Sequence, residues 1–133
     1  MDISDKAIEY GMNLLEERKL VEKAATLIVN KDLNFNELDK KYDFIIAQSV
    51  FTHLPKEYIE ECFENLHKIM NANSKFYFTC NYSDKEEKRG ILGFFYPFEF
   101  FSALAAKYNY TCSDISSVYK HPLGQNMIVI QLQ

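Results

Sequence analysis

The sequence lacks both an excess of basic residues and a long apolar run. It has 15 lysines and arginines against 19 acidic residues, a formal net charge of −4, and its cations are scattered among acids. This pattern disfavours a nucleic acid as partner. No apolar run reaches the roughly 20 residues of a membrane-spanning helix, and the polar, acidic start MDISDKAIEY does not resemble a signal peptide. We therefore expect a soluble, cytoplasmic protein that binds neither nucleic acid nor membrane.

Cysteine is also scarce. The three cysteines, Cys62, Cys80 and Cys112, lie far apart, and none belongs to a CxxC pair or has a histidine at ligand spacing. An odd number of isolated cysteines argues against a disulfide framework and against a zinc site. We expect reduced, mostly buried thiols and no bound metal.

The composition is that of a folded domain. The chain has 133 residues, of which 47% are hydrophobic and 15% aromatic, and it contains no repeat or low-complexity stretch. A chain of this length and composition can bury a core of its own. Because no linker-like stretch divides it, we predict one domain over residues 1–133.

Three segments have the pattern of helices. Ser4 is a suitable N-cap for a helix that runs to about Glu17, with Asp5 in its first turn. Pro55 suits the first turn of a second helix, and Pro97 opens a third. The second helix has the clearest amphipathic pattern. Its apolar residues at spacings of 3, 4 and 7 are Ile59, Cys62, Phe63, Leu66, Ile69 and Met70.

Between and after these helices, five segments have the pattern of strands. They are residues Ala24 to Asn30, Tyr42 to Gln48, Lys75 to Asn81, Tyr110 to Tyr119 and Gln125 to Leu132. The continuous apolar centre of the second, Phe44 to Ala47, suits a strand covered on both faces. Strands that alternate with helices indicate an α/β domain, and the last two strands, joined by a turn at HPLG, indicate an antiparallel edge.

Several strings, in this order, resemble the C-terminal two-thirds of class I S-adenosylmethionine-dependent methyltransferases. They are MDISDKAIEYG, YDFIIAQSVFTHLP, the helix from Tyr58 followed by KFYFTC, YPFEFFSALAAKYNY and HPLGQNMIVIQL. The resemblance implies a truncated Rossmann-like sheet, mostly parallel with a C-terminal antiparallel hairpin and flanked by helices. It also implies S-adenosylmethionine as the cofactor.

One feature of that family is missing. Its members carry a first strand and a turn of the type DxGxGxG, whereas Gly11, Gly90, Gly93 and Gly124 are isolated here. Glycines at such a turn let the backbone approach the cofactor closely. We therefore expect this chain alone to bind S-adenosylmethionine weakly or not at all.

The resemblance also assigns cofactor-binding residues. Asp2, with Ile3 beside it, would lie at the ribose, whose two hydroxyls suit the two oxygens of a carboxylate. Asp32 would accept from the adenine amino group and Leu33 would pack on the adenine ring. Gln48 and Ser49, where a strand ends, would contact the methionyl part. The alternatives are that Asp2 is a frayed terminal residue and that Asp32 is an ordinary loop aspartate. For Gln48 and Ser49, the alternative is that they are polar residues at the end of a strand with no role in binding.

For the acceptor side we single out Phe51, His53, Phe95 and Tyr96. His53 could take a proton from the acceptor as a general base, although a capping or solvent-facing histidine is the slightly favoured alternative. Phe94 to Tyr96, preceded by Gly90 and Gly93, could form a lid over an acceptor pocket, whereas Phe98 and Phe101, at helical spacing, are expected to pack in the core. His121, which precedes Pro122 in the turn, is interpreted as structural.

Three functions remain open. The first is methyl transfer from S-adenosylmethionine to an oxygen or nitrogen of a small-molecule acceptor. The second is a catalytically inactive methyltransferase-like module that forms a homo-oligomer or is completed by a strand from a partner chain, because a sheet without its first strand leaves edges that invite pairing. The third is an incomplete reading frame.

Overall fold

The computed structural model describes residues 1–23, 25–91 and 93–133. The chain forms two compact units, Met1–Leu33 and Asn34–Gln133, here named the N-terminal unit and the C-terminal unit. Each is described by itself.

The N-terminal unit is built around helix α1 (Asp5–Glu17), which confirms the predicted first helix. The N-cap is also as predicted, because Ser4 Oγ accepts a hydrogen bond from the Ala7 N–H at 3.2 Å. None of the residues of α1 is buried. A 3-10 turn (Val21–Lys23) follows the helix.

The predicted strand from Ala24 to Asn30 is wrong over its described part, and Ala24 itself lies outside the described residues. Only Val29 pairs, in an isolated parallel bridge with Asp2. The Asp2 N–H donates to the Ile28 carbonyl at 3.1 Å, and the Asn30 N–H donates to the Asp2 carbonyl at 2.9 Å. Because the N-cap of α1, Ser4, comes only two residues after Asp2, the pairing does not extend into a ladder.

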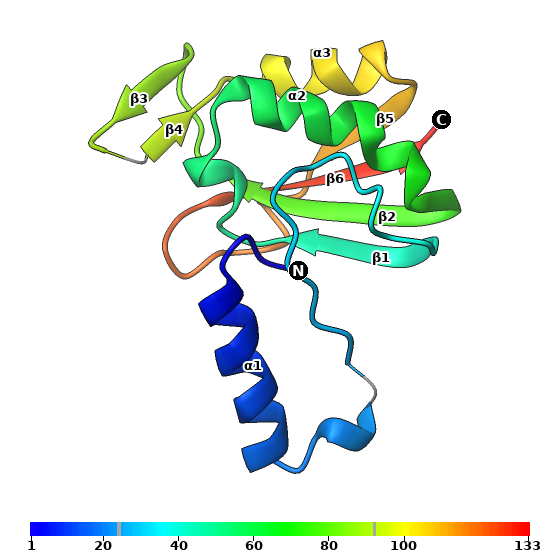
Figure 1. The fold of residues 1–133 in the computed structure, drawn as a ribbon. Coiled ribbons are helices and arrows are strands. Elements are labelled where there is room, and N and C mark those ends of the chain that lie inside the picture. Colours follow the sequence, from blue (N-terminus) through cyan, green and yellow to red (C-terminus); the bar gives the residue numbers. More distant parts are fainter. Residues whose placement is uncertain (24, 92) are drawn as a thin grey trace. The chain divides into compact units, whose positions relative to one another are not determined.

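The C-terminal unit contains a four-stranded sheet of order β1-β2-β6-β5 (Figure 1). Strands β1 (Tyr42–Ala47) and β2 (Met70–Cys80) are parallel. Strand β6 (Asn126–Leu132) runs antiparallel to β2 and to β5 (Tyr110–Asp114). The predicted α/β fold, with antiparallel strands at its C-terminal end, is confirmed.

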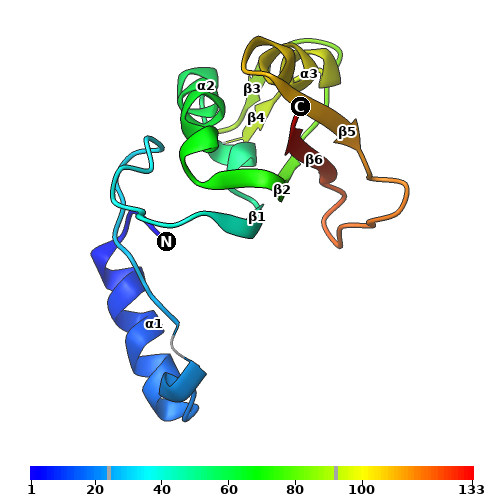
Figure 2. The same cartoon turned by 90° about the vertical axis from the view of Figure 1, so that its right-hand side faces the viewer.

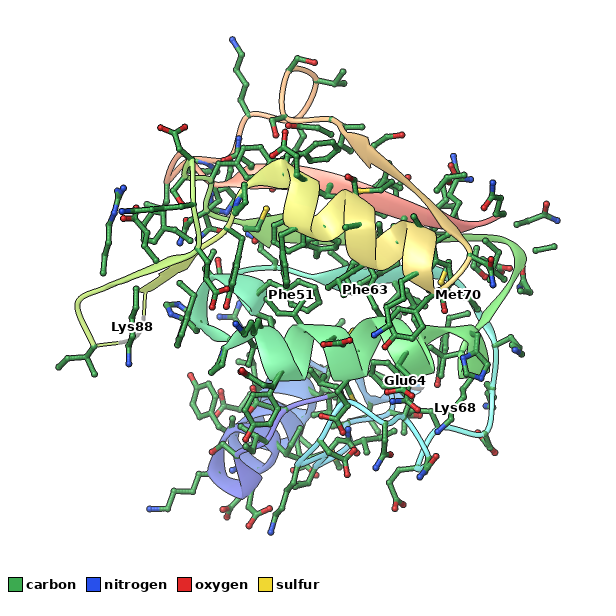
Figure 3. All side chains as sticks on the ribbon, turned by 90° about the horizontal axis from the view of Figure 1, so that it is seen from above. Phe51, Phe63, Glu64, Lys68, Met70 and Lys88 are labelled. Atoms are coloured by element: carbon green, nitrogen blue, oxygen red, sulfur yellow. The ribbon has the colours of Figure 1, made fainter. Side chains whose placement is uncertain are left out.

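Helices α2 (Lys56–Asn65) and α3 (Phe98–Lys107) lie over the same face of this sheet (Figures 1 and 2). The core lies between them and the sheet, and Figure 3 shows Phe51 and Phe63 between the two helices. All six residues of the apolar pattern predicted for the second helix are buried. From the sheet, Phe76, Phe78, Ile128 and Ile130 are buried on this face.

Three predicted boundaries differ from the structure. Helix α2 ends at Asn65 rather than near Met70, and a 3-10 turn (Leu66–Lys68) leads directly into β2. Strand β2 starts at Met70, before the predicted Lys75, because Ser74 Oγ holds its irregular first part by donating to the Tyr42 carbonyl at 2.6 Å. Strand β5 ends at Asp114 rather than Tyr119, since the Asp114 carboxylate accepts the Ser116 N–H at 2.8 Å and starts a turn.

The charged and aromatic segment between β2 and α3 forms a small hairpin. Its strands are β3 (Glu87–Arg89) and β4 (Gly93–Phe95). The Lys88 ammonium lies 5.3 Å from the Phe94 ring centroid, and the Arg89 guanidinium lies 4.2 Å from that of Phe95. Cation–π contacts across the hairpin therefore join its charged strand to its aromatic strand.

The three cysteines are free, with Cys62 and Cys80 buried and Cys112 half-buried. Burial raises the pKa of the Cys112 thiol to about 11 and raises those of Cys62 and Cys80 further. Within the described residues, every helix is too short or too polar to cross a bilayer.

Candidate functional site

The end of β1 is tied to two other segments of the C-terminal unit. Ser49 follows β1 with a left-handed φ of 56°, so the chain turns sharply there. The Ser49 N–H donates to Thr79 Oγ1 at the end of β2 at 2.7 Å, and Ser49 Oγ donates to Gln125 Oε1, just before β6, at 3.1 Å. The residues after β1 are thus held at the carboxyl ends of the parallel strands, where open α/β sheets bind ligands.

Gln48 meets a histidine that is remote in sequence. The Gln48 side-chain nitrogen and His121 Nε2 are 3.4 Å apart, and His121 is buried. The other ring nitrogen, His121 Nδ1, accepts the Leu123 N–H at 3.2 Å, which fixes the orientation of the ring in its turn. The turn that holds His121 therefore positions Gln48.

His53 lies in the same loop. It ends the 3-10 turn Phe51–His53, its N–H donates to the Val50 carbonyl at 3.0 Å, and its side chain is exposed. The imidazole is therefore accessible to a molecule that approaches this end of the sheet.

Two of the predicted acceptor residues lie in the core instead. Phe51 is 1% exposed, with its ring centroid 4.6 Å from that of Phe78. Tyr96 is 1% exposed and its hydroxyl donates to the Leu54 carbonyl at 3.0 Å. Burial, with Glu86 and Glu57 nearby, raises the pKa of Tyr96 to about 12. This placement fits packing rather than contact with an acceptor, whereas Phe95 remains partly exposed beneath Arg89.

A cleft that we did not predict lies beyond the end of β2. It measures about 600 Å³ and is lined by Tyr82, Ser83, Asp84, Pro97, Phe98 and Glu99. The rings of Tyr82 and Phe98 meet edge to face with centroids 6.2 Å apart. The string YSD directly after the third predicted strand was the available signal, because polar residues at such a strand end often line a site.

The remaining predicted cofactor residues belong to the N-terminal unit. Asp2 is exposed and its Oδ1 accepts the Ser4 N–H at 2.8 Å. The bridge to Val29 places Asp2 beside the segment that leads to Asp32. The Asp32 carbonyl accepts the Asn30 side-chain amide at 2.5 Å. Ile3 is 68% exposed, and Leu33 is half-buried. The pairing of its backbone shows that Asp2 is not frayed.

Comparison with known proteins identifies a family and a fold. The family model described as tellurite resistance protein TehB matches residues 1–119. No curated protein sequence matches the chain.

Three solved structures illustrate the similarity. PKMT2 from Rickettsia typhi, in complex with AdoHcy, has a TM-score of 0.80 at 12% identity over 99% of this chain and 44% of its own. A S-adenosylmethionine-dependent methyltransferase from Clostridium acetobutylicum has a TM-score of 0.73 at 9% identity, over 98% of this chain and 72% of its own. Magnesium protoporphyrin IX methyltransferase from Synechocystis, with bound SAM, has a TM-score of 0.70 at 14% identity, over 98% of this chain and 57% of its own.

The TM-scores of 0.70 to 0.80 show a shared fold, which is that of class I methyltransferases. The chain spans less than two thirds of the length of two of these three proteins.

Proposed function

The chain belongs to the family of tellurite resistance protein TehB, and from this premise we propose that it functions in methyl transfer from S-adenosylmethionine to an oxygen or nitrogen of a small molecule. The methyltransferase fold of the structural neighbours supports the reaction class. Because the chain spans 44% of the Rickettsia protein and 57% of the Synechocystis protein, the activity is proposed for a protein or assembly that contains it.

The residues at the predicted cofactor positions fit the chemistry of S-adenosylmethionine in part. Gln48 and Ser49 would hold the methionyl part, Asp2 and Ile3 would lie at the ribose, and Asp32 and Leu33 at the adenine. One oxygen of Asp2 already accepts the Ser4 N–H, which leaves the second oxygen for a ribose hydroxyl. This sequence contains no glycine-rich turn to add further contacts to the cofactor. We therefore propose that the chain alone binds S-adenosylmethionine weakly.

The cofactor supplies a sulfonium-bound methyl group. The chain's part is to position the acceptor in line with that group, which accounts for much of the rate in such displacements. In this proposal His53 accepts the proton that the acceptor hydroxyl or amine loses, since its imidazole is exposed at the same loop as Gln48.

The cleft beyond β2 is the proposed acceptor site. The rings of Tyr82 and Phe98 offer apolar surface, and the carboxylates of Asp84 and Glu99 lie in the same lining. Two carboxylates repel anions. A neutral or cationic acceptor therefore fits this cleft better than an oxyanion such as tellurite.

The observation that carries the proposal is the connection of Ser49 to Thr79 and Gln125. Equilibrium dialysis of the chain against millimolar radiolabelled S-adenosylmethionine tests it. We expect measurable retention by the native chain, less by Gln48→Leu, and native retention by the matched control Gln133→Leu at the exposed C-terminus. Equal retention by Gln48→Leu, or none by the native chain, would contradict the proposal.

Calorimetry at micromolar concentrations tests the expected weak affinity for S-adenosylmethionine separately from the proposed methyl transfer. We expect no binding heat, because the chain has no glycine-rich turn. Micromolar affinity would show that this turn is dispensable, while leaving the proposed reaction intact.

A further inference from the structure

Ser49, the second residue after β1, has a backbone conformation that a serine rarely adopts. Its φ is 56°, which lies in the left-handed region that favours glycine. A residue in such a conformation persists only when the surrounding structure holds it there, and such residues cluster at binding and active sites. The contacts of Ser49 therefore show what fixes the chain at the end of β1.

Two hydrogen bonds to different segments hold Ser49 in this conformation. Its N–H donates to Thr79 Oγ1 at 2.7 Å, and its hydroxyl donates to Gln125 Oε1 at 3.1 Å. Thr79 is fully buried and belongs to the neighbouring strand β2, whereas Gln125 comes just before β6. Thr79 therefore fixes the backbone of Ser49, and Gln125 fixes its hydroxyl group.

Gln125 is itself held in place by the turn that precedes it. The Gly124 N–H donates to the His121 carbonyl at 3.0 Å, and the Leu123 N–H donates to His121 Nδ1 at 3.2 Å. Gly124 has a left-handed φ of 72°, which glycine adopts without strain. On the other side, Asn126 begins β6, which pairs with β2. Gln125 thus lies between a closed turn and a paired strand, and both restrict its backbone.

The bond to Gln125 decides how the Ser49 hydroxyl can contact a ligand. A serine hydroxyl has one proton to donate and two lone pairs that accept. Because Ser49 Oγ donates its proton to Gln125, only its lone pairs remain for a ligand, and the residue is half-buried rather than enclosed. An ammonium group, which only donates, fits such an oxygen, whereas a carboxylate, which only accepts, does not.

From these contacts we propose that Gln125 is a positioning residue, which fixes the Ser49 hydroxyl as an acceptor for the protonated amino group of the methionyl part of the cofactor. The inference rests on the proposed function, in which Ser49 lies at the methionyl part. Gln125 lies beyond residues 1–119, the part of the chain that the family model matches. The inference therefore comes from the contacts of this chain and not from the family.

Hydrogen exchange of the Ser49 amide, measured without ligand, tests the positioning. Gln125→Met keeps the length of the side chain but removes the acceptor, and exchange should become about two- to tenfold faster, the range expected for one lost hydrogen bond. Gln125→Glu should exchange at the native rate, because a carboxylate can only accept. The control Gln133→Met, at the exposed C-terminus, should also match the native chain. Native exchange in Gln125→Met, or equally fast exchange in Gln125→Glu, overturns the proposal.

Equilibrium dialysis with two ligands tests the role of the amino group. The probes are S-adenosylhomocysteine and its analogue in which hydrogen replaces the amino group, each at millimolar concentration. The native chain should retain S-adenosylhomocysteine about two- to tenfold better than the analogue. Gln125→Met should lose most of this preference, and Gln125→Glu should keep it.

Each outcome of the dialysis decides one proposal. An absent preference in the native chain, or an unchanged preference in Gln125→Met, overturns the role of Gln125. Retention of neither ligand by the native chain contradicts the proposed function and, with it, the binding of an amino group at Ser49. In that case the exchange of the Ser49 amide still decides whether Gln125 positions Ser49.

Discussion

The two units of the chain differ in how much apolar surface they bury. In the C-terminal unit, α2, α3 and the sheet enclose side chains with no exposed surface, such as Phe63, Phe78 and Ile128. In the N-terminal unit, none of the residues of α1 is buried, and Tyr10 and Met12 are 70% and 48% exposed. Since apolar burial is the main favourable term in folding, the C-terminal unit carries most of the stability of the chain.

This difference bears on the proposed cofactor site. The residues proposed for the ribose and adenine, Asp2 and Asp32, belong to the weakly buried unit. Those proposed for the methionyl part, Gln48 and Ser49, are held by the well-packed unit. We therefore expect preorganisation at the methionyl end of the site and little at the adenosine end, which is a physical reason for weak binding by the chain alone.

The largest expected effect is in the core of the C-terminal unit. Phe78→Ala removes a fully buried ring and should lower the free energy of unfolding by about 3–5 kcal/mol. The exposed Met12→Ala in α1 should change it by less than about 0.5 kcal/mol. Urea denaturation followed by circular dichroism measures both. Equal losses would show that the N-terminal unit shares the cooperative core, against the comparison above.

A pair of serine variants sharpens the same comparison. Ser74 is fully buried and its hydroxyl joins β2 to Tyr42, so Ser74→Ala should cost about 1–3 kcal/mol of unfolding free energy. Ser4→Ala removes the N-cap of α1, where the loss should appear as fraying of that helix. Hydrogen exchange read residue by residue should show faster exchange across the sheet for Ser74→Ala, and in α1 alone for Ser4→Ala. Faster exchange in the sheet of Ser4→Ala would argue against independent units.

A third expected effect is a pH dependence of stability. The pKa of Tyr96 is raised from 10.0 to about 12, chiefly by burial. A raised pKa in an acid means that the folded state favours the neutral phenol. The contribution of Tyr96 to stability is therefore complete below pH 10 and is lost as the pH rises toward 12. Urea titrations between these values should show a shallower decline for Tyr96→Phe than for the native chain. Parallel curves would contradict this reading of Tyr96.

Local patterns predicted the helices well. The N-cap at Ser4 and the spacing of Ile59, Phe63 and Leu66 depend on neighbours within one or two turns, and both are confirmed. The order of strands and helices likewise predicted the α/β fold. The ends of β2 and β5 were predicted less well, because side-chain hydrogen bonds of Ser74 and Asp114 decide them.

The site could be predicted only in part. Gln48 and Ser49 were recognised as a strand exit, but their partners His121 and Gln125 lie 73 and 76 positions away in the sequence and become visible only in the folded chain. Phe51 and Tyr96 were assigned to an acceptor pocket because aromatic residues suit either a pocket or a core. Tertiary packing determines which of these two environments an aromatic residue occupies, and it cannot be predicted from the neighbouring residues in the sequence.

The central claim is that the loop after β1 is where the methyl donor binds. Titration of the ¹⁵N-labelled chain with S-adenosylhomocysteine, followed by amide chemical shifts, tests it directly. We predict progressive shifts concentrated at Gln48, Ser49 and His53, with the amides of β5 unmoved. Shifts confined to other parts of the chain, or none at millimolar ligand, would contradict the account.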